Sequence, residues 1–173
     1  PPVSAPLYSS AASDVYKRQV MSTLNIWKKL SSKPCGKWAF SKALCFKAPY
    51  FASISPKFEE LRPEFCKVSI SKSRKVTNHL GTVHAIAMCN MAELSGGTMT
   101  EVTVPATHRW IPKGMTVEYL KKATTGLVAT ATPATSLDLT QPSEYLVNVE
   151  VKDQLDEVVF KAVITMWISP KKA

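Results

Sequence analysis

Several stretches of alternating hydrophobic and polar residues lie in the C-terminal two-thirds of the chain and predict β-strands. In Phe65–Ser71, for example, Cys66, Val68 and Ile70 share one face and polar residues share the other, which is typical of a half-buried strand. The loop HRWIPKG separates two of the further strands, and the turn DQLDE joins the last two as a hairpin. These further strands are predicted at 98–104, 115–122, 126–132, 147–152 and 158–168.

A single helix is predicted at residues 82–97, where the alternation stops. Thr82 is a suitable N-cap, and Gly96–Gly97 would end the helix. Because the segment is apolar on nearly every face, we expect it to be buried all round. One buried helix together with several antiparallel strands predicts an α+β fold, in which the sheet wraps around the helix.

The segment from Met21 to Phe58 contains seven lysines and no acidic residue. Aromatic residues such as Trp38 and Phe46 lie among the lysines, which predicts one or two short amphipathic helices. Pro34–Gly36 would break these helices and Pro49 would end them. We expect the aromatic faces to dock on the domain, and binding to a membrane surface is the alternative.

The first twenty residues show no sustained periodicity, and the string YSSAASDVYKRQ resembles a translated library adapter. We therefore expect the natural protein to start at Met21. This divides the chain into an extension over residues 1–20, a basic amphipathic segment over 21–47 and a folded domain over 48–173.

The chain of 173 residues carries a formal net charge of +9, which is concentrated before residue 76. A basic front half suits phosphate-bearing ligands, acidic partners or anionic lipid, and it also fits an ordinary solvated surface. No RNP, KH or zinc pattern accompanies the charge, so we expect no nucleic acid partner. No stretch approaches 18 consecutive apolar residues, so we expect no stable membrane insertion.

The four cysteines, Cys35, Cys45, Cys66 and Cys89, have spacings that fit no zinc pattern, and we expect neither a metal nor a cofactor. We interpret them as reduced and mostly buried thiols of an intracellular protein. A cytoplasmic location is expected. A mitochondrial one stays open, although the basic segment contains lysine where a presequence is rich in arginine.

The strings NHLGTVHA and AELSGG match a known family pattern at Asn78, Gly81–Thr82, His84–Ala85 and Glu93. In these residues the chain resembles the hotdog-fold acyl-CoA thioesterases of the PaaI-like group, and it looks closest to an uncharacterised branch of that superfamily. The resemblance covers most of Ala48–Ser169. It implies a hotdog domain over 48–173 and hydrolysis of acyl-CoA or aryl-CoA thioesters.

The resemblance also implies a site. Asn78 and the backbone N–H of Ala85 would polarise the thioester carbonyl, helped by the helix dipole, and Glu93 would be the general base or the nucleophile. Arg109 and Lys113 would suit the phosphates of coenzyme A. A structural alternative exists for Asn78 as a turn former and for Glu93 as a carboxylate bonded to backbone. Substrate-binding positions are expected at Gly81, Thr82, His84, Asn90, Arg109 and Lys113.

The spacing of Ala85 and Glu93 requires two chains. Eight residues along one helix span about 12 Å, so a single thioester cannot reach both in one subunit. We therefore expect a homodimer or tetramer with a coenzyme A thioester as substrate. Asn90 lies one turn from Glu93 and is a candidate hydrogen-bond partner for it, and Thr103 and Thr107 are candidates to orient the attacking water. The alternative function is a non-catalytic hotdog domain that binds an acyl thioester or serves as an assembly unit.

Overall fold

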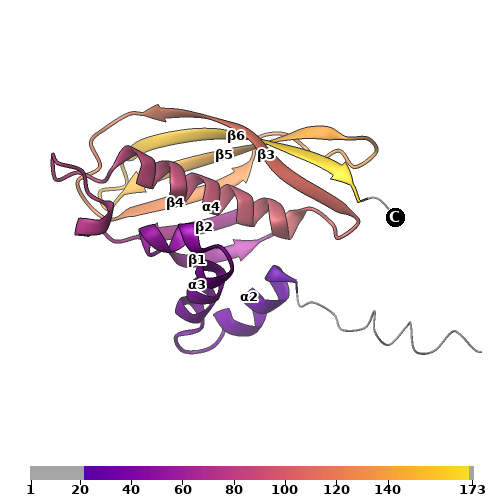
Figure 1. Ribbon diagram of the computed structural model, residues 1–173, viewed down its shortest axis with the longest axis horizontal. Helices are drawn as coiled ribbons and strands as arrows, with labels where there is room; N and C mark the ends of the chain where they lie inside the picture. Colours follow the sequence, from indigo (N-terminus) through magenta and orange to yellow (C-terminus); the bar gives the residue numbers. More distant parts are fainter. Residues whose placement is uncertain (1–21, 172–173) are drawn as a thin grey trace, which may run out of the picture.

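The computed structural model describes residues 22–171, which form a six-stranded antiparallel sheet with one long helix, α4 (Ala85–Thr103), against one face (Figure 1). The strands follow the order β1-β2-β4-β5-β6-β3, so β1 and β3 are the two edges. This arrangement confirms the predicted α+β fold. The extension predicted over residues 1–20 lies outside the described residues.

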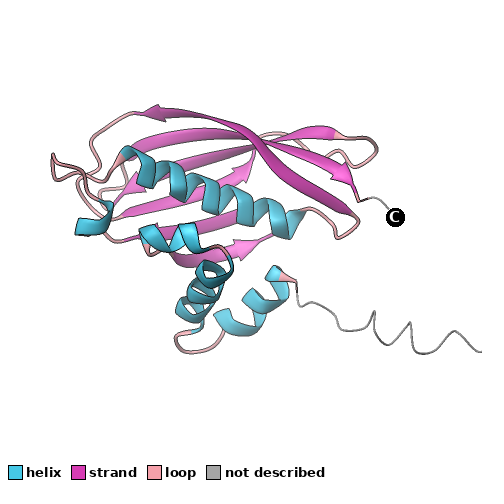
Figure 2. Cartoon of the chain, in the orientation of Figure 1, coloured by secondary structure: helices cyan, strands magenta, loops and turns pink. Residues whose placement is uncertain are grey.

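The remaining elements follow the chain order of the prediction, with one strand, β1, that the sequence pattern did not indicate (Figure 2). Their bounds are α2 (Thr23–Ser31), α3 (Gly36–Lys47), η1 (Pro49–Ile54), β1 (Lys57–Arg62), β2 (Phe65–Ile70), η2 (Arg74–Val76), β3 (His108–Tyr119), β4 (Leu127–Pro133), β5 (Ser143–Asp153) and β6 (Val158–Pro170). The strands predicted at 126–132, 147–152 and 158–168 correspond to β4, β5 and β6.

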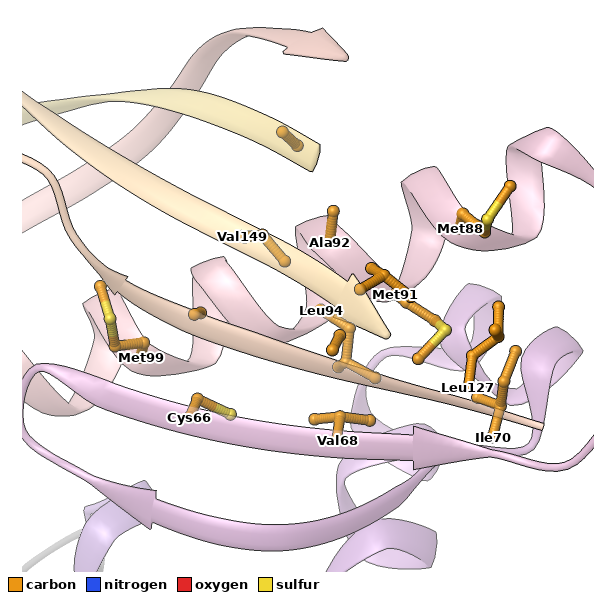
Figure 3. Packing of buried hydrophobic residues seen from close by; sticks show 14 of the residues in the cluster. Cys66, Val68, Ile70, Met88, Met91, Ala92, Leu94, Met99, Leu127 and Val149 are labelled. Carbon is orange, nitrogen blue, oxygen red and sulfur yellow. The ribbon is translucent and has the colours of Figure 1, made fainter. Parts of the chain in front are cut away.

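The core lies between α4 and the inner face of the sheet. In β2, Cys66, Val68 and Ile70 are buried as the alternation predicts, and Met91 and Leu94 of α4 pack against this face (Figure 3). Burial raises the pKa of the Cys66 thiol far above its usual range. Cys66 is therefore a neutral packing side chain rather than a reactive thiol.

Helix α4 begins later and ends later than the sequence pattern indicated. It starts at Ala85 rather than at Thr82, and the predicted end at Gly96–Gly97 is wrong. A Cβ added at Gly96 would lie 2.8 Å from Cδ1 of Ile164 in β6. The glycine at this position therefore lets the helix approach the sheet closely, and it does not end the helix.

The strand predicted at 98–104 is the last part of α4. Its threonines and valines favour strands, but packing overrides this preference. The Thr100 and Thr103 hydroxyls donate to the carbonyls of Gly96 and Met99, one turn earlier. Each hydroxyl is thus satisfied within the helix, which makes it compatible with the interior.

The predicted loop HRWIPKG belongs to the edge strand β3. The pairing of β3 with β6 shifts register between Pro112 and Gly114, which forms a bulge. Proline lacks a backbone N–H and is tolerated here because β3 is an edge.

The two edges of the sheet, β3 and β1, differ in length and in exposed side chains. Strand β3 spans 12 residues and exposes the apolar side chains Ile111 and Met115, whereas β1 spans six and has its own register shift between Phe58 and Glu60.

The basic segment forms the two predicted helices, α2 and α3, which lie beside β1 (Figure 1). Trp27 of α2, Phe40 of α3 and Phe58 of β1 form an aromatic cluster, with ring centroids 5.0 Å apart for Trp27–Phe40 and 5.1 Å for Phe40–Phe58. Docking is therefore confirmed for these aromatic side chains. Within residues 22–171, none of the helices combines the length and the apolar character that crossing a membrane requires.

Other aromatic side chains of the segment do not dock. Trp38 and Phe46 of α3 and Tyr50 of η1 are exposed, so the expectation that the aromatic faces pack on the domain is wrong for them. Helix α3 packs on the domain through Phe40 and Leu44. Its opposite face also has large apolar side chains, and these are exposed.

Polar contacts also fix α3 to β1. The Ser41 hydroxyl accepts a hydrogen bond from the Phe58 N–H at 2.9 Å, and the Lys37 ammonium donates to the Glu59 carbonyl at 2.7 Å. Partial burial raises the pKa of the Glu59 carboxyl, but hydrogen bonds from Lys57 and Ser69 and the nearby Lys37 charge outweigh burial and lower it below its usual value.

We expect Gly36→Ala to destabilise the junction between α2 and α3. A Cβ at this position would lie 1.7 Å from the carbonyl oxygen of Leu30, a backbone atom that cannot move independently. The free energy of unfolding, measured in urea, should fall by about 1–3 kcal/mol. The control Ala43→Ser, on the exposed side of α3, should stay within about 0.5 kcal/mol of wild type. Equal stability of both variants would contradict the close approach.

Candidate functional site

Helix α4 is not buried all round, because one stripe faces away from the sheet. Ile86, Glu93 and Glu101 are exposed along it, and Gly97 continues the same stripe at helical spacing. The other faces of the helix pack on the sheet, on η1 and on α2. The stripe is therefore the part of α4 that can meet a ligand.

A groove of about 360 Å³ lies over this stripe, a volume within the range of small-molecule sites. Figure 1 shows α3 and β3 on opposite sides of α4. The lining is mostly apolar, with Glu93 and Glu101 among its few polar members. It comprises Thr23, Leu44, Lys47, Ala48, Phe51, Glu93, Leu94, Gly97, Thr98, Glu101, Trp110, Pro112 and Met166.

The two carboxylates of the groove differ in their partners. Glu101 accepts a hydrogen bond from the indole N–H of Trp110 at 2.8 Å. Gly97 makes room for that indole, since a Cβ there would lie 3.2 Å from the ring. The side-chain carboxylate of Glu93 has no hydrogen bond or ion pair with any of residues 22–171. Glu93 is thus the carboxylate that is free to act on a ligand, and the sequence pattern did not reveal that Glu101 shares its groove.

The first turn of α4 contains a free backbone donor. His84, and not Thr82 as predicted, is the N-cap, because its Nδ1 accepts a hydrogen bond from the Ile86 N–H at 3.1 Å. The Ala85 N–H has no acceptor within the described part of the chain. An unpaired N–H at a helix N-terminus, where the helix dipole is positive, can stabilise a developing oxyanion.

Asn78 closes the turn that leads into α4. Its Oδ1 accepts hydrogen bonds from the N–H groups of Leu80 and Thr82, and its Nδ2 donates to the Thr82 hydroxyl at 2.9 Å. Gly81 takes a positive φ of 73° in this turn, a conformation that favours glycine. The predicted group Asn78, Gly81 and Thr82 therefore forms one local unit, in which the Asn78 side chain already has partners.

A thiol and a phenol meet on the outward side of α4. Cys89 lies one turn before Glu93, and its Sγ is 3.2 Å from the hydroxyl of Tyr119 at the end of β3. This hydrogen bond, with some burial, raises the pKa of Tyr119 to about 12. Tyr119 is thus protonated at neutral pH. The spacing of Cys89 and Glu93 was visible in the sequence, but nothing in it indicated Tyr119.

Asn90 does not bond Glu93 as expected. Its Nδ2 donates to the Ser53 hydroxyl of η1 at 3.1 Å, and its buried Oδ1 has no partner in the described residues. Neither Thr103 nor Thr107 is placed to orient a water at Glu93, because Thr103 bonds the backbone at the far end of α4 and Thr107 contacts the His108 ring. Thr98 lines the groove instead, and sequence reasoning missed it.

Arg109 and Lys113 lie on β3 and not in a loop. The Arg109 Nε donates to the Ser169 hydroxyl at 3.1 Å. The Lys113 ammonium pairs with Glu144 at 2.6 Å and lies 5.0 Å from the Trp167 ring centroid. These partners belong to the sheet face opposite α4, so the structure does not bring the two cations together with Glu93.

A larger hollow, of about 860 Å³, lies on that outer face of the sheet. One row of residues crosses it in register, with Lys67, Glu150, Lys161 and Glu118 among its members. Opposite charges alternate along this row, as expected for a solvated sheet face. None of the predicted catalytic residues lines the hollow. Among residues 22–171, no group of three or more His, Cys, Asp or Glu side chains could hold a metal ion.

We expect Asn78→Ala to lower the free energy of unfolding by about 1–2 kcal/mol, because two backbone N–H groups lose their acceptor. Asn78→Asp keeps both acceptors and should stay within about 0.5 kcal/mol of wild type. Urea denaturation of the two variants checks this. If Asn78→Ala is as stable as wild type, the turn does not depend on this side chain.

Comparisons with known proteins agree with the fold. A crystal structure described as genomics APC5556 shares 44% sequence identity, with a TM-score of 0.74, over 87% of this chain and 99% of that one. A probable thioesterase from Pseudomonas aeruginosa shares 21% identity (TM-score 0.64, 71% of this chain and 88% of that one). A thioesterase from Haemophilus influenzae shares 9% (TM-score 0.63, 70% and 82%). A search of curated proteins gives no match.

The two thioesterases show that the chain has the hotdog fold of thioesterase-family proteins. The sequence itself matches a family model over residues 36–168, which includes α3 and every strand and helix of the sheet domain. The matched region thus joins the basic helix α3 and the hotdog domain in one unit. The chain belongs to the family described as a domain of unknown function, DUF4442.

Proposed function

We propose that this protein hydrolyses acyl-CoA or aryl-CoA thioesters at sites shared between two copies of the chain. The observation that carries the proposal is the unpartnered carboxylate of Glu93, exposed on the wall of an apolar groove in a thioesterase-type fold. An apolar groove suits an acyl or aryl group, and a free carboxylate can activate water beside it.

In the proposed reaction, the thioester carbonyl oxygen accepts a hydrogen bond from the free Ala85 N–H. Glu93 takes a proton from a water molecule as the oxygen of that water adds to the carbonyl carbon. The carbon–sulfur bond then breaks, and the leaving coenzyme A thiolate takes the proton from Glu93, which returns to the carboxylate. Direct attack by the Glu93 carboxylate, followed by hydrolysis of the anhydride, gives the same products.

The two groups come from different chains in this proposal. Ala85 and Glu93 lie about 12 Å apart along α4, which is too far for one carbonyl. Strand β3 runs antiparallel to α4, since Trp110 meets Glu101 and Tyr119 meets Cys89. Pairing of two β3 edges about a two-fold axis would bring the start of one α4 toward the later half of the other.

The free edge of β3 supports this pairing. An exposed strand edge with apolar side chains is a template for another strand, and Ile111 and Met115 are exposed there. Leu80 and Ile86 extend the exposed apolar surface around the start of α4. Contact of coenzyme A phosphates with Arg109 and Lys113 would require the nucleotide to cross the sheet edge, because both face away from α4.

A non-catalytic hotdog domain that binds an acyl thioester is the second candidate. The Asn78 side chain favours it, because both its oxygen and its nitrogen are engaged in the turn and are not directed at a substrate. The same groove would then hold the acyl group without turnover.

We expect Glu93→Gln to lower kcat by at least about 10², the scale of general-base loss. KM should change little, because the carboxylate acts on water. The matched control is Glu101→Gln, which keeps an acceptor for the Trp110 indole and should retain kcat within about threefold. Thiol release from a panel of acyl-CoA and aryl-CoA thioesters measures both. Full turnover in Glu93→Gln would contradict the role of Glu93, whereas no turnover of any thioester by the wild-type chain would favour the binding module.

Mixing two inactive variants tests the shared site. Ala85→Pro should lose kcat because it removes the N–H that polarises the carbonyl, and proline is tolerated at the first position of a helix. A heterodimer with Glu93→Gln has one site with both defects and one with neither. After random exchange, activity should therefore approach about a quarter of wild type.

Sedimentation of the wild-type chain provides the control, and a dimer or larger species is expected at micromolar concentration. A folded monomer, or no recovery of activity despite demonstrated subunit exchange, would contradict the shared site.

A further inference from the structure

Helix α3 presents a second apolar face to the outside. Trp38, Lys42 and Phe46 follow one another at intervals of four residues, so they share this face. Trp38 is 60% exposed, Phe46 is 92% exposed, and Tyr50 in the adjoining η1 is 68% exposed. The inner face of α3 already packs through Phe40. We call the exposed rings of Trp38, Phe46 and Tyr50 the outer aromatic face. Packing of the domain does not account for these three side chains.

The outer aromatic face has little contact with the rest of the protein. Among the described residues, the Trp38 ring stacks on no other aromatic ring. The Lys42 ammonium lies 5.9 Å from its centroid. Trp38, Lys42 and Phe46 line one side of a shallow hollow of about 440 Å³, and Pro56 and Lys57 line the other. Large exposed side chains grouped in this way mark an interaction surface.

Lysines are frequent in the segment that contains the outer aromatic face, and Lys42 and Lys57 lie beside its rings. Lys37 and Lys57 pair with Glu59 at 3.8 and 3.0 Å. No carboxylate of residues 22–171 lies within 4 Å of the other five, and no acidic residue occurs between residues 22 and 58. These five are Lys28, Lys29, Lys33, Lys42 and Lys47, of which Lys42 lies on the outer aromatic face and Lys47 lines the groove over α4. The partner of this surface must therefore be both apolar and negatively charged.

We propose that the outer aromatic face docks on an anionic phospholipid surface. Tryptophan and tyrosine rings favour the headgroup level of a bilayer, and a shallowly inserted phenylalanine adds apolar burial. Lysine stems can lie along the acyl boundary while the ammonium groups meet lipid phosphates. The protein then associates with the membrane peripherally, through a surface separate from the groove over α4.

Single-stranded nucleic acid fits this surface less well. Its bases would need aromatic rings within stacking reach of successive nucleotides. Trp38 and Phe46 are eight residues apart on one helix, or about 12 Å along the axis. On this face of α3 no other ring lies between them, because Lys42 occupies the intervening turn and Phe40 points inward. A bilayer surface needs no such spacing.

Flotation of the full chain with vesicles tests the proposal. We expect binding to phosphatidylcholine vesicles that contain phosphatidylglycerol, and little binding to phosphatidylcholine alone. Binding should weaken as salt is added, because the lysine contribution is screened. Trp38 fluorescence should shift to shorter wavelength on binding, and Trp38→Phe should lose that shift.

The decisive variant is the double substitution Trp38→Ala/Phe46→Ala. Its binding to anionic vesicles should be weaker than that of wild type by at least about tenfold. The matched control is Leu155→Ala, a side chain that is 76% exposed in the β5–β6 turn, outside the lysine-rich segment. It should bind like wild type. Thermal unfolding should show that both variants remain folded, as expected for changes at exposed positions.

Three results would overturn the proposal. The first is equal binding to neutral and anionic vesicles. The second is wild-type binding by the double variant. The third is a double variant that binds vesicles like wild type but has lost another property of the wild-type chain. That property would be binding to a single-stranded RNA oligonucleotide or self-association in sedimentation. The third would assign the face to nucleic acid or to a second copy of the chain.

Discussion

The close contact of α4 with the sheet determines most of what else the molecule can do. Gly96 allows the helix to lie so near to β6 that even a methyl group would meet Ile164. At that distance the sheet covers the inner side of the helix, and η1 covers part of its flank. One outward stripe remains, and both carboxyl-bearing side chains of the helix, Glu93 and Glu101, lie on it. Packing thus confines the chemistry of α4 to one line of residues.

The basic helices complete the groove over that line. Leu44, Ala48 and Phe51 provide one wall, and they are held in place by the aromatic cluster of Trp27 and by the Ser41–Phe58 hydrogen bond. The family match begins at residue 36, so it includes α3. Helix α3 is therefore part of the domain, with one face on the groove and the other on solvent. The part of the basic segment that forms α3 thus contacts the domain directly.

The sequence predicted the fold class because alternation in β2, β4, β5 and β6 reports directly which side chains are buried. It misplaced the end of α4, since Gly96–Gly97 and the threonine-rich stretch have the local preferences of a stop and a strand. Only the tertiary contact with Ile164 and the backbone bonds of Thr100 reverse those preferences. Within the candidate site, Glu93 and Ala85 were predictable through the resemblance of the motif that contains them. Glu101, Thr98 and Tyr119 were not, because their relation to Glu93 depends on the path of β3 and on a groove between elements distant in sequence.

The unlike edges of the sheet limit how many chains can associate through strands. The β1 edge is short, bulged and lined by charged residues, among them Lys57, Glu60 and Arg62, which discourages the addition of a strand. The β3 edge is long and partly apolar. A sheet that accepts a strand at one edge only cannot extend indefinitely, since each copy uses its single receptive edge once. In the proposed pairing through β3, edge-to-edge association would therefore close at a symmetric pair, and the shape of β1 would oppose the head-to-tail growth that leads to fibres.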